Sequence, residues 1–317
     1  MDGKTPEIVI IGAGGMGALF GAILRSSGLA VTLYDINDDH IAAIQRHGLK
    51  LEGFGGDRTV EIAATSDAAG LTQADVLLFQ CKGHGTRSAV RSVRHLVDGG
   101  AVCISFQNGL GNEEVLAEEV GEANVIGGLT TMAGCLLGLG RVQDFSRVSS
   151  YIGEMAGGVS ERCKQIAEAF TQAGLETHAS PNIRRDIWKK LLGNIAMSAV
   201  SGTTNLTSAS CLKIPALKAT GIRALDEALA VANSQGIDLD RDEAIAGMEA
   251  ISIPGGTGDA KSSLCIDILN RRQTEVDYIY GSVIALGREK NIPTPTLETI
   301  ASLVKGIESH YLEKNDD

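Results

Sequence analysis

The chain has 317 residues, of which 44% are hydrophobic and 21% charged, and its formal net charge at pH 7 is -11. This length and composition predict a soluble globular protein with enough apolar sequence for two domains. Because an acidic surface repels phosphate backbones and anionic lipids, neither nucleic acid nor a membrane is expected as a partner.

The cysteine and histidine content gives no sign of a metal centre or of disulfides. The six cysteines lie far apart without CxxC spacing, several of them inside apolar runs, and the six histidines are equally scattered. We expect reduced core thiols, no metal and a cytoplasmic location. No signal peptide opens the sequence, and no apolar run reaches the ~18 residues of a membrane span.

The elements expected along the chain change in character near residue 181. Up to that point strand-like apolar runs alternate with helical stretches, which predicts a Rossmann-type, doubly wound parallel sheet over residues 1–181. Beyond Pro181 the pattern is helical throughout, which predicts an all-helical domain over residues 182–317. The expected strands after the first are 31–34, 76–80, 102–106, 125–129 and 151–153, and the later helical patterns are 182–200, 215–236, 240–251 and 259–310.

The first apolar run, IVIIGAGGMG at residues 8–17, breaks into a glycine-rich turn that is typical of dinucleotide binding. In this spacing the first glycine permits the tight turn, the second lets a pyrophosphate approach the backbone, and the third lets helix pack on strand. The helix expected over 18–27 would hold the phosphate charge at its N-terminus. The residues expected to line the cofactor here are Gly12, Gly14, Gly15, Met16 and Gly17.

Asp35 ends the next apolar run, about 20 residues further on, where a carboxylate can accept both ribose hydroxyls of NAD. The same carboxylate would repel the 2′-phosphate of NADP, and the following acids at 38 and 39 bring no compensating Lys or Arg. We therefore expect NAD, with NADP as the alternative. The other interpretation of Asp35 is that it only caps the next helix.

The helix expected over 182–200 carries a polar stripe on its apolar face. At ~100° per residue, Lys190, Asn194 and Ser198 fall on the same side as Ile187 and Leu191. Burial of an ammonium or an amide is costly unless it is paired, so the stripe suggests a polar cleft. The alternative is that Lys190 extends to solvent and Asn194 bonds a backbone carbonyl.

Reduction of a carbonyl by hydride needs a group that protonates the developing alkoxide, and a lysine ammonium does so at neutral pH. Lys190 is placed for that role. An amide such as Asn194 or Asn108 can hold a substrate oxygen, and an acid such as Glu275 can orient the lysine.

Four separated motifs resemble the ketopantoate reductases over nearly the whole chain. They are IVIIGAGGMGALFGAIL, QNGLG at 107–111, WKKL at 188–191 with Asn194, and KSSL at 261–264 followed by RQTEVDYIYG at 272–281. The resemblance implies a Rossmann domain joined to a helical domain, and reduction of a 2-oxo acid to a 2-hydroxy acid. It implies that Lys190 is the general acid and that Glu275 lies near the reaction centre. It also implies that Lys82 and Asn108 lie close to the cofactor, and that Asn108, Asn194, Ser198 and Ser263 contact the substrate.

Two residues depart from the family pattern. Its best-known members use NADPH and have a basic residue where this chain has Asp35, and many have a second asparagine where it has Ser198. The smaller side chain leaves room in the pocket. Relatives such as the D-mandelate dehydrogenases, which use NAD and act on branched or aromatic 2-oxo acids, are therefore also similar to this chain.

Other interpretations stay open for single motifs and for the whole. Asn108-Gly109 is an ordinary turn dipeptide, Glu275 can serve a helix terminus, and Lys82 can be a solvated charge at a strand end. For the whole chain the alternatives are a β-hydroxyacid dehydrogenase and a non-catalytic NAD-binding sensor. The oligomeric state is open as well, with a homodimer as one alternative.

Overall fold

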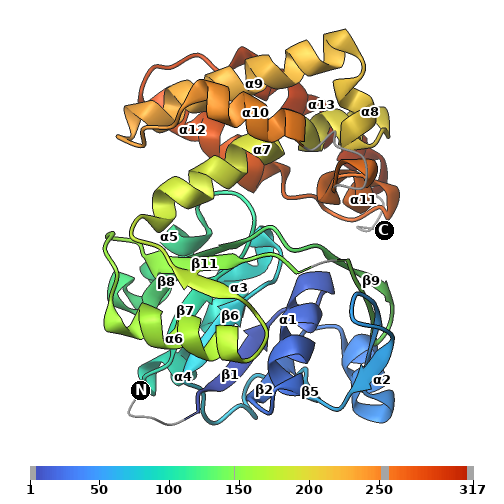
Figure 1. Ribbon diagram of the computed structural model, residues 1–317, viewed down its shortest axis with the longest axis vertical. Helices are drawn as coiled ribbons and strands as arrows, with labels where there is room; N and C mark the ends of the chain where they lie inside the picture. Colours follow the sequence, from blue (N-terminus) through green and yellow to red (C-terminus); the bar gives the residue numbers. More distant parts are fainter. Residues whose placement is uncertain (1–4, 146, 251–256, 313–317) are drawn as a thin grey trace. The chain divides into compact units, whose positions relative to one another are not determined.

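The computed structural model describes residues 5–145, 147–250 and 257–312, which form two compact units (Figure 1). The sheet unit holds the described residues up to Gln107 together with Asn112–Arg184. The helical unit holds Asn108–Gly111 and the described residues from Arg185 onwards. The two units are described separately below.

An eight-stranded sheet in the order β12-β11-β8-β7-β6-β1-β2-β5 organises the sheet unit. The order β5-β2-β1-β6-β7-β8 is that of a dinucleotide-binding Rossmann sheet, and all its neighbouring strands are parallel. The strands are β1 (Glu7–Ile11), β2 (Ala30–Tyr34), β5 (Ala63–Thr65), β6 (Val76–Phe79), β7 (Val102–Ser105), β8 (Val125–Thr130), β11 (Ser150–Glu154) and β12 (Thr177–Ala179).

The expectation of a wholly parallel sheet is wrong at one pair, because β11 runs antiparallel to β8. A parallel neighbour needs a long crossover, usually a helix. The described residues between these two strands, 131–145 and 147–149, hold no helix; they form the strands β9 (Gly134–Gly138) and β10 (Arg141–Asp144) instead.

Helices cover both faces of this sheet. Side chains of a strand alternate between faces, and in β1 Ile8 packs in one core cluster with Phe20, whereas Val9 packs in another with Leu116. Figure 1 shows α1 and α6 on the near face. The helices of this unit are α1 (Gly15–Ser26), α2 (Asp38–His47), α3 (Thr86–Ser92), α4 (Arg94–Asp98), α5 (Asn112–Val120) and α6 (Glu161–Gln172), with short 3-10 turns η1 (Gly83–Gly85) and η2 (Glu122–Asn124).

A second sheet, in the order β4-β3-β10-β9, was not predicted from the sequence. It joins β3 (Leu49–Gly53) and β4 (Arg58–Val60) to β9 and β10, which lie about ninety residues further along the chain. These strands are short and partly exposed, so their apolar pattern is weak.

The helical unit packs around its own core, which contains Trp188, Leu225 and Tyr280. The single helical pattern expected over 259–310 is broken in the structure by turns at 270–274 and 290–294. Residue 251, the expected end of another helix, lies outside the described residues. The elements are α7 (Ile183–Thr204), α8 (Ser208–Leu212), α9 (Pro215–Ser234), α10 (Arg241–Ala250), η3 (Thr257–Asp259), α11 (Ser263–Leu269), the π-helix η4 (Asp277–Gly281), α12 (Ser282–Glu289) and α13 (Pro295–Leu312).

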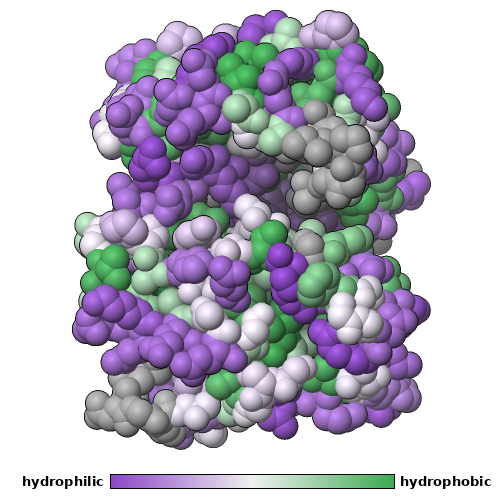
Figure 2. All heavy atoms as spheres, viewed as in Figure 1, coloured by the Kyte–Doolittle hydropathy of each residue, from purple (hydrophilic) through white to green (hydrophobic). Residues whose placement is uncertain are grey.

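The surface of each unit carries both hydrophilic and hydrophobic residues. Figure 2 shows hydrophilic residues interspersed with hydrophobic ones over the visible face. Single exposed apolar side chains such as Ile36 and Leu303 are ordinary for a globular protein. Among the residues that the structure describes, none of the helices has the length and apolar character needed to cross a bilayer.

Candidate functional site

The glycine-rich loop connects β1 to α1 at the point where the strand order of the sheet reverses, between β2 and β6. A Cβ added to Gly12, which has a φ of +99°, would lie 2.6 Å from the backbone nitrogen of Cys81. One added to Gly17 would lie 1.9 Å from the carbonyl oxygen of Gly12. Both positions therefore require glycine, as the sequence predicts.

Gly14 differs from its neighbours in the loop, because a Cβ placed there would meet no atom within 4 Å. Gly14 is the N-cap of α1 and no side chain caps the helix, so the first N–H groups of the helix lack a side-chain partner. Gly15 and Met16 form the first turn and are half-buried. Open space beside uncapped N–H groups is what a pyrophosphate needs, so the loop fits the nucleotide that the sequence predicts.

Asp35 follows β2 and is held by backbone donors. Its Oδ2 accepts a hydrogen bond of 2.7 Å from the N–H of Ala13, and its Oδ1 accepts one of 2.9 Å from the N–H of Asn37. The cap of α2 is the side chain of Asn37, which accepts from the N–H of His40. Asp35 is therefore not the helix cap that the alternative interpretation required; its carboxylate lies against the glycine loop.

His40 supports the same loop and was missed in the sequence, because a lone histidine in a helix carries no pattern. The N–H of Gly140 lies 3.1 Å from Nδ1 of His40, and Nε2 lies 2.9 Å from the carbonyl oxygen of Ala13. Since Nδ1 accepts, Nε2 carries the proton and donates to Ala13. This buried ring thus connects the glycine loop to the second sheet.

Lys82 follows β6 and is the N-cap of η1. Gln107, which follows β7, holds the backbone of the preceding residue, Cys81. Nε2 of Gln107 donates to the carbonyl oxygen of Cys81 over 2.8 Å and to Oγ1 of Thr86 over 2.7 Å. Nε2 of Gln80 is buried and has no hydrogen-bond partner among the described residues. A buried amide without a partner is rare, and the backbone of Gln80 lies against Gly12 of the loop.

A second group of predicted residues comes together in the helical unit. Nζ of Lys190 donates to Oδ1 of Asn108 over 2.8 Å, and Nδ2 of Asn108 donates to Oε2 of Glu275 over 3.4 Å. Lys190 and Asn108 are half-buried, whereas Glu275 is 6% exposed. Asn108 is 82 positions from Lys190 and 167 positions from Glu275 in the sequence. The three side chains form one hydrogen-bonded chain of ammonium, amide and carboxylate.

Asn108 reaches this place because its loop packs closely on η4. The N–H of Leu110 donates to the carbonyl oxygen of Tyr278 over 2.9 Å. Gly109 has a φ of +88°, and a Cβ there would lie 2.3 Å from the same oxygen. The Asn-Gly pair is therefore more than an ordinary turn, since only glycine permits this approach.

The polar stripe predicted on α7 exists. Lys190 and Asn194 are half-buried and Ser198 is 6% exposed, in a helix whose other residues from Leu191 to Val200 are largely buried. Lys190 does not simply extend to solvent, because it bonds Asn108. The neighbouring Lys189, in contrast, is exposed and pairs with Glu243.

Ser263 is exposed and is the first residue of α11. The serine before it makes the contacts. Oγ of Ser262 caps α11 by accepting from the N–H of Cys265, and it donates to the carbonyl oxygen of Ser198 over 2.9 Å. The importance of Ser262 was missed, since two adjacent serines cannot be distinguished by pattern.

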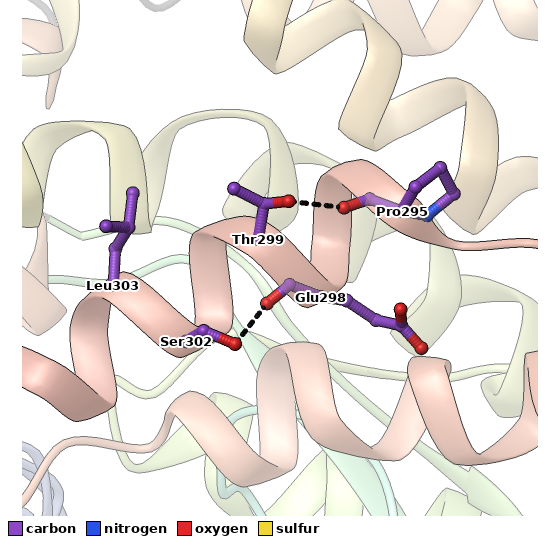
Figure 3. Close-up of a pocket in the computed structure, with 5 residues that line it drawn as sticks. All are labelled: Pro295, Glu298, Thr299, Ser302 and Leu303. Carbon is purple, nitrogen blue, oxygen red and sulfur yellow. Dashed lines mark hydrogen bonds between the residues drawn. The ribbon is translucent and has the colours of Figure 1, made fainter.

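A surface hollow of about 500 Å³ lies on α13, lined by Pro295, Glu298, Thr299, Ser302 and Leu303 (Figure 3). Its hydroxyl groups bond carbonyl oxygens of the same helix, Thr299 to Pro295 and Ser302 to Glu298. Polar groups that are satisfied within their own helix do not converge on a ligand, so this hollow carries no chemistry.

The predicted residues thus form two sets. The cofactor set belongs to the sheet unit except for Asn108, which was predicted to contact both cofactor and substrate; its other members are Gly12, Gly14, Gly15, Met16, Gly17, Asp35 and Lys82. The set predicted for chemistry and substrate binding, Asn108, Lys190, Asn194, Ser198, Ser263 and Glu275, belongs to the helical unit.

Comparison with known proteins identifies two consecutive family models in the chain. Residues 8–157 match the model "Ketopantoate reductase PanE/ApbA", and residues 182–308 match "Ketopantoate reductase PanE/ApbA C terminal". These matches confirm the resemblance found in the sequence and favour it over a β-hydroxyacid dehydrogenase.

Individual relatives agree with the family models. A 2-dehydropantoate 2-reductase of Pyrococcus abyssi is 30% identical over 303 residues, covering 96% of this chain and 98% of the relative. The structure of D-mandelate dehydrogenase with NADH and anilino(oxo)acetate has a TM-score of 0.93 and 27% identity, and covers 96% of this chain and 99% of that chain. A ketopantoate reductase from Ralstonia eutropha JMP134 has a TM-score of 0.88 and 27% identity over the same shares.

Proposed function

Since the chain belongs to the ketopantoate reductase family, we propose that it reduces a 2-oxo acid to the 2-hydroxy acid, with Lys190 as the proton donor. The chain is an oxidoreductase, and the nicotinamide cofactor supplies the hydride when it is bound. The observation that carries the proposed role is the hydrogen-bonded chain from Lys190 through Asn108 to Glu275.

Lys190 supplies the proton in this proposal. As the C–H bond forms at the carbonyl carbon, the C=O π electrons move to the oxygen, which takes a proton from Nζ. The lysine is left as a neutral amine and recovers its proton from solvent. The ammonium also stabilises the negative charge on the oxygen before the transfer is complete.

Asn108 and Glu275 orient the lysine. Oδ1 of Asn108 accepts from Nζ, and because Nδ2 of the same amide donates to Glu275, the amide cannot turn over without loss of both bonds. Glu275 is 6% exposed, and by accepting from Nδ2 it fixes which end of the Asn108 amide faces Lys190. Asn194, Ser198 and Ser263 would contact the carboxylate and the side chain of the substrate.

We further propose NADH as the physiological cofactor, with NADPH as the poorer one. Both oxygens of Asp35 are held by backbone N–H groups, so the carboxylate cannot swing away from a 2′-phosphate. At about 4 Å, repulsion between two unit charges amounts to ~1 kcal/mol in water and ~4 kcal/mol at a protein surface. A preference for NADH of roughly five- to a thousandfold in Kd follows.

For the substrate we propose a 2-oxo acid with a branched or aromatic side chain. Ser198 leaves more space than the second asparagine found in many relatives, and the D-mandelate dehydrogenase with NADH and anilino(oxo)acetate is similar over 96% of this chain. Ketopantoate represents the branched acids of this class, and phenylglyoxylate represents the aromatic ones.

Steady-state kinetics with ketopantoate and phenylglyoxylate, each with NADH and NADPH, test these proposals. Lys190→Met should lower kcat by on the order of 10² or more while NADH binding stays unchanged. Lys189→Met is the matched control, since Lys189 lies next in sequence but is exposed. Equal turnover of both variants would refute the role of Lys190, and tighter binding of NADPH would refute the cofactor proposal.

A homodimer and a cytoplasmic location remain predictions from the sequence. Light scattering of the purified protein and fractionation of the source cells test them.

A further inference from the structure

Tyr280 makes an unusual contact with α7, the helix that carries Lys190, Asn194 and Ser198. Its hydroxyl accepts from the N–H of Ala199 over 3.0 Å and donates to the carbonyl oxygen of Ile195 over 2.7 Å. In a regular α-helix these two backbone groups, at positions i and i-4, bond each other directly. The hydroxyl therefore acts on one step of the hydrogen-bond ladder, and a side chain at such a step bends or opens a helix.

The place of this step in α7 is significant. Asn194 lies just before Ile195, and Ser198 lies just before Ala199, so the turn that this step closes begins after Asn194 and contains Ser198. Lys190 and Asn194 lie N-terminal to this turn, and Ser198 lies within it. The spacing of Ser198 from the other two thus depends on how far the step is open.

Tyr280 is also fully buried within its own segment, η4. It is 0% exposed, and burial raises the pKa of its phenol, so the hydroxyl keeps the proton that it donates to Ile195. It lies in the π-helix η4, and such turns are rare and often occur at functional sites.

The segment from Glu275 to Tyr280 contacts both the loop that carries Asn108 and the helix that carries Lys190. The Glu275 carboxylate accepts from Asn108, the Tyr278 carbonyl accepts from Leu110, and the Tyr280 hydroxyl bonds α7. Ser198 is held from a second side by Ser262, which donates to its carbonyl oxygen.

From these contacts we infer that Tyr280 is a positioning residue for the 2-oxo acid: its hydroxyl sets the distance of Ser198 from Lys190 and Asn194, and through Ser198 the fit of the substrate side chain. This inference rests on the proposed function. It assigns Tyr280 no contact with the reacting atoms.

Tyr280→Phe tests the inference, because it removes one oxygen atom and leaves Ala199 and Ile195 free to bond each other. We expect KM for the preferred 2-oxo acid to rise roughly tenfold, with a smaller change in kcat and no change in the Kd of NADH. The ratio of kcat/KM between phenylglyoxylate and ketopantoate should change as well. Tyr311→Phe is the matched control, since it removes a hydroxyl that donates to a carbonyl oxygen in the same unit, that of Arg272.

A double-mutant cycle with Ser198→Ala separates positioning from general loss of stability. If Tyr280 acts through Ser198, the double variant should have nearly the KM of the Ser198→Ala variant. Additive effects, or an unchanged KM in a folded Tyr280→Phe variant, would overturn the inference.

Two further outcomes are distinguishable. Absence of turnover by the wild type with every 2-oxo acid would refute the proposed function itself, before any variant is compared. If Tyr280→Phe does not fold, Tyr280→Met, which fills much of the same volume with a flexible apolar side chain, takes its place in the same cycle.

Discussion

The pH dependence of folding should depend strongly on Glu113, a buried carboxyl group in the first turn of α5. It is 4% exposed, and burial raises its pKa from 4.5 to about 7, although the Ser105 hydroxyl and Arg184 favour its charged form. The raised pKa means that the folded protein binds this proton more tightly than the unfolded chain does. The stabilising contribution is thus complete below pH 4.5 and is lost as the pH rises through about 7.

The size of the effect follows from the pKa shift. At 1.36 kcal/mol per pKa unit, the rise from 4.5 to about 7 corresponds to ~3 kcal/mol. Glu113→Gln has nearly the same shape but no ionisation. The free energy of unfolding of the wild type, relative to this variant, should therefore fall by ~3 kcal/mol between pH 4.5 and pH 8.

Urea denaturation of both proteins across this pH range, followed by circular dichroism, measures the difference directly. Glu122→Gln, an exposed glutamate of the same unit, serves as the control and should show no such trend. A difference between wild type and Glu113→Gln that is the same at pH 5 and pH 8 would show that burial does not shift this group.

Three other substitutions have expected outcomes. Asp35→Asn should reduce the ratio of the NADPH and NADH dissociation constants by about fivefold or more in fluorescence titrations, while Asp38→Asn should not; a stronger preference for NADH would contradict this. His40→Leu should weaken NADH binding about tenfold, because it removes the hydrogen bond from the ring to the glycine loop. His47→Leu is the control at an exposed position, and equal NADH affinities of the two variants would contradict this prediction. Gly109→Ala should raise KM for the 2-oxo acid by displacing Asn108, whereas Gly111→Ala, with a similar φ but open space at its Cβ, should not; equal effects would assign the change to backbone strain alone.

The cofactor loop could be predicted from the sequence because its constraints are local. Gly12 and Gly17 are needed for close backbone approaches, and Gly14 leaves open space at the N-terminus of α1. The spacing of the three glycines is visible in ten residues. Asp35 could be placed at the end of a strand for the same reason. The face of α7 was also predictable, since the periodicity of one helix brings Lys190, Asn194 and Ser198 to the same side.

Features that depend on distant partners were missed. The second sheet pairs β3 with β10 across about ninety residues, and neither strand has enough apolar residues to be recognised alone. The break in the pattern over 259–310 was missed for a local reason, the conformation of one turn. Arg271, with a φ of +53°, lies in the turn after α11, where the N–H of Arg272 returns to the carbonyl oxygen of Asp267.

The site in the helical unit shows where prediction from a pattern has to stop. The sequence supplies the residue types, but the contacts from Lys190 through Asn108 to Glu275 depend on how the loop of Asn108 packs. Position 109 has to be glycine because the carbonyl of Tyr278 lies against it. The same segment then reaches α7 through Tyr280, whose hydroxyl bonds backbone groups rather than side chains. A backbone partner is the same for every residue type, so no choice of amino acid at positions 195 or 199 could reveal this contact in advance.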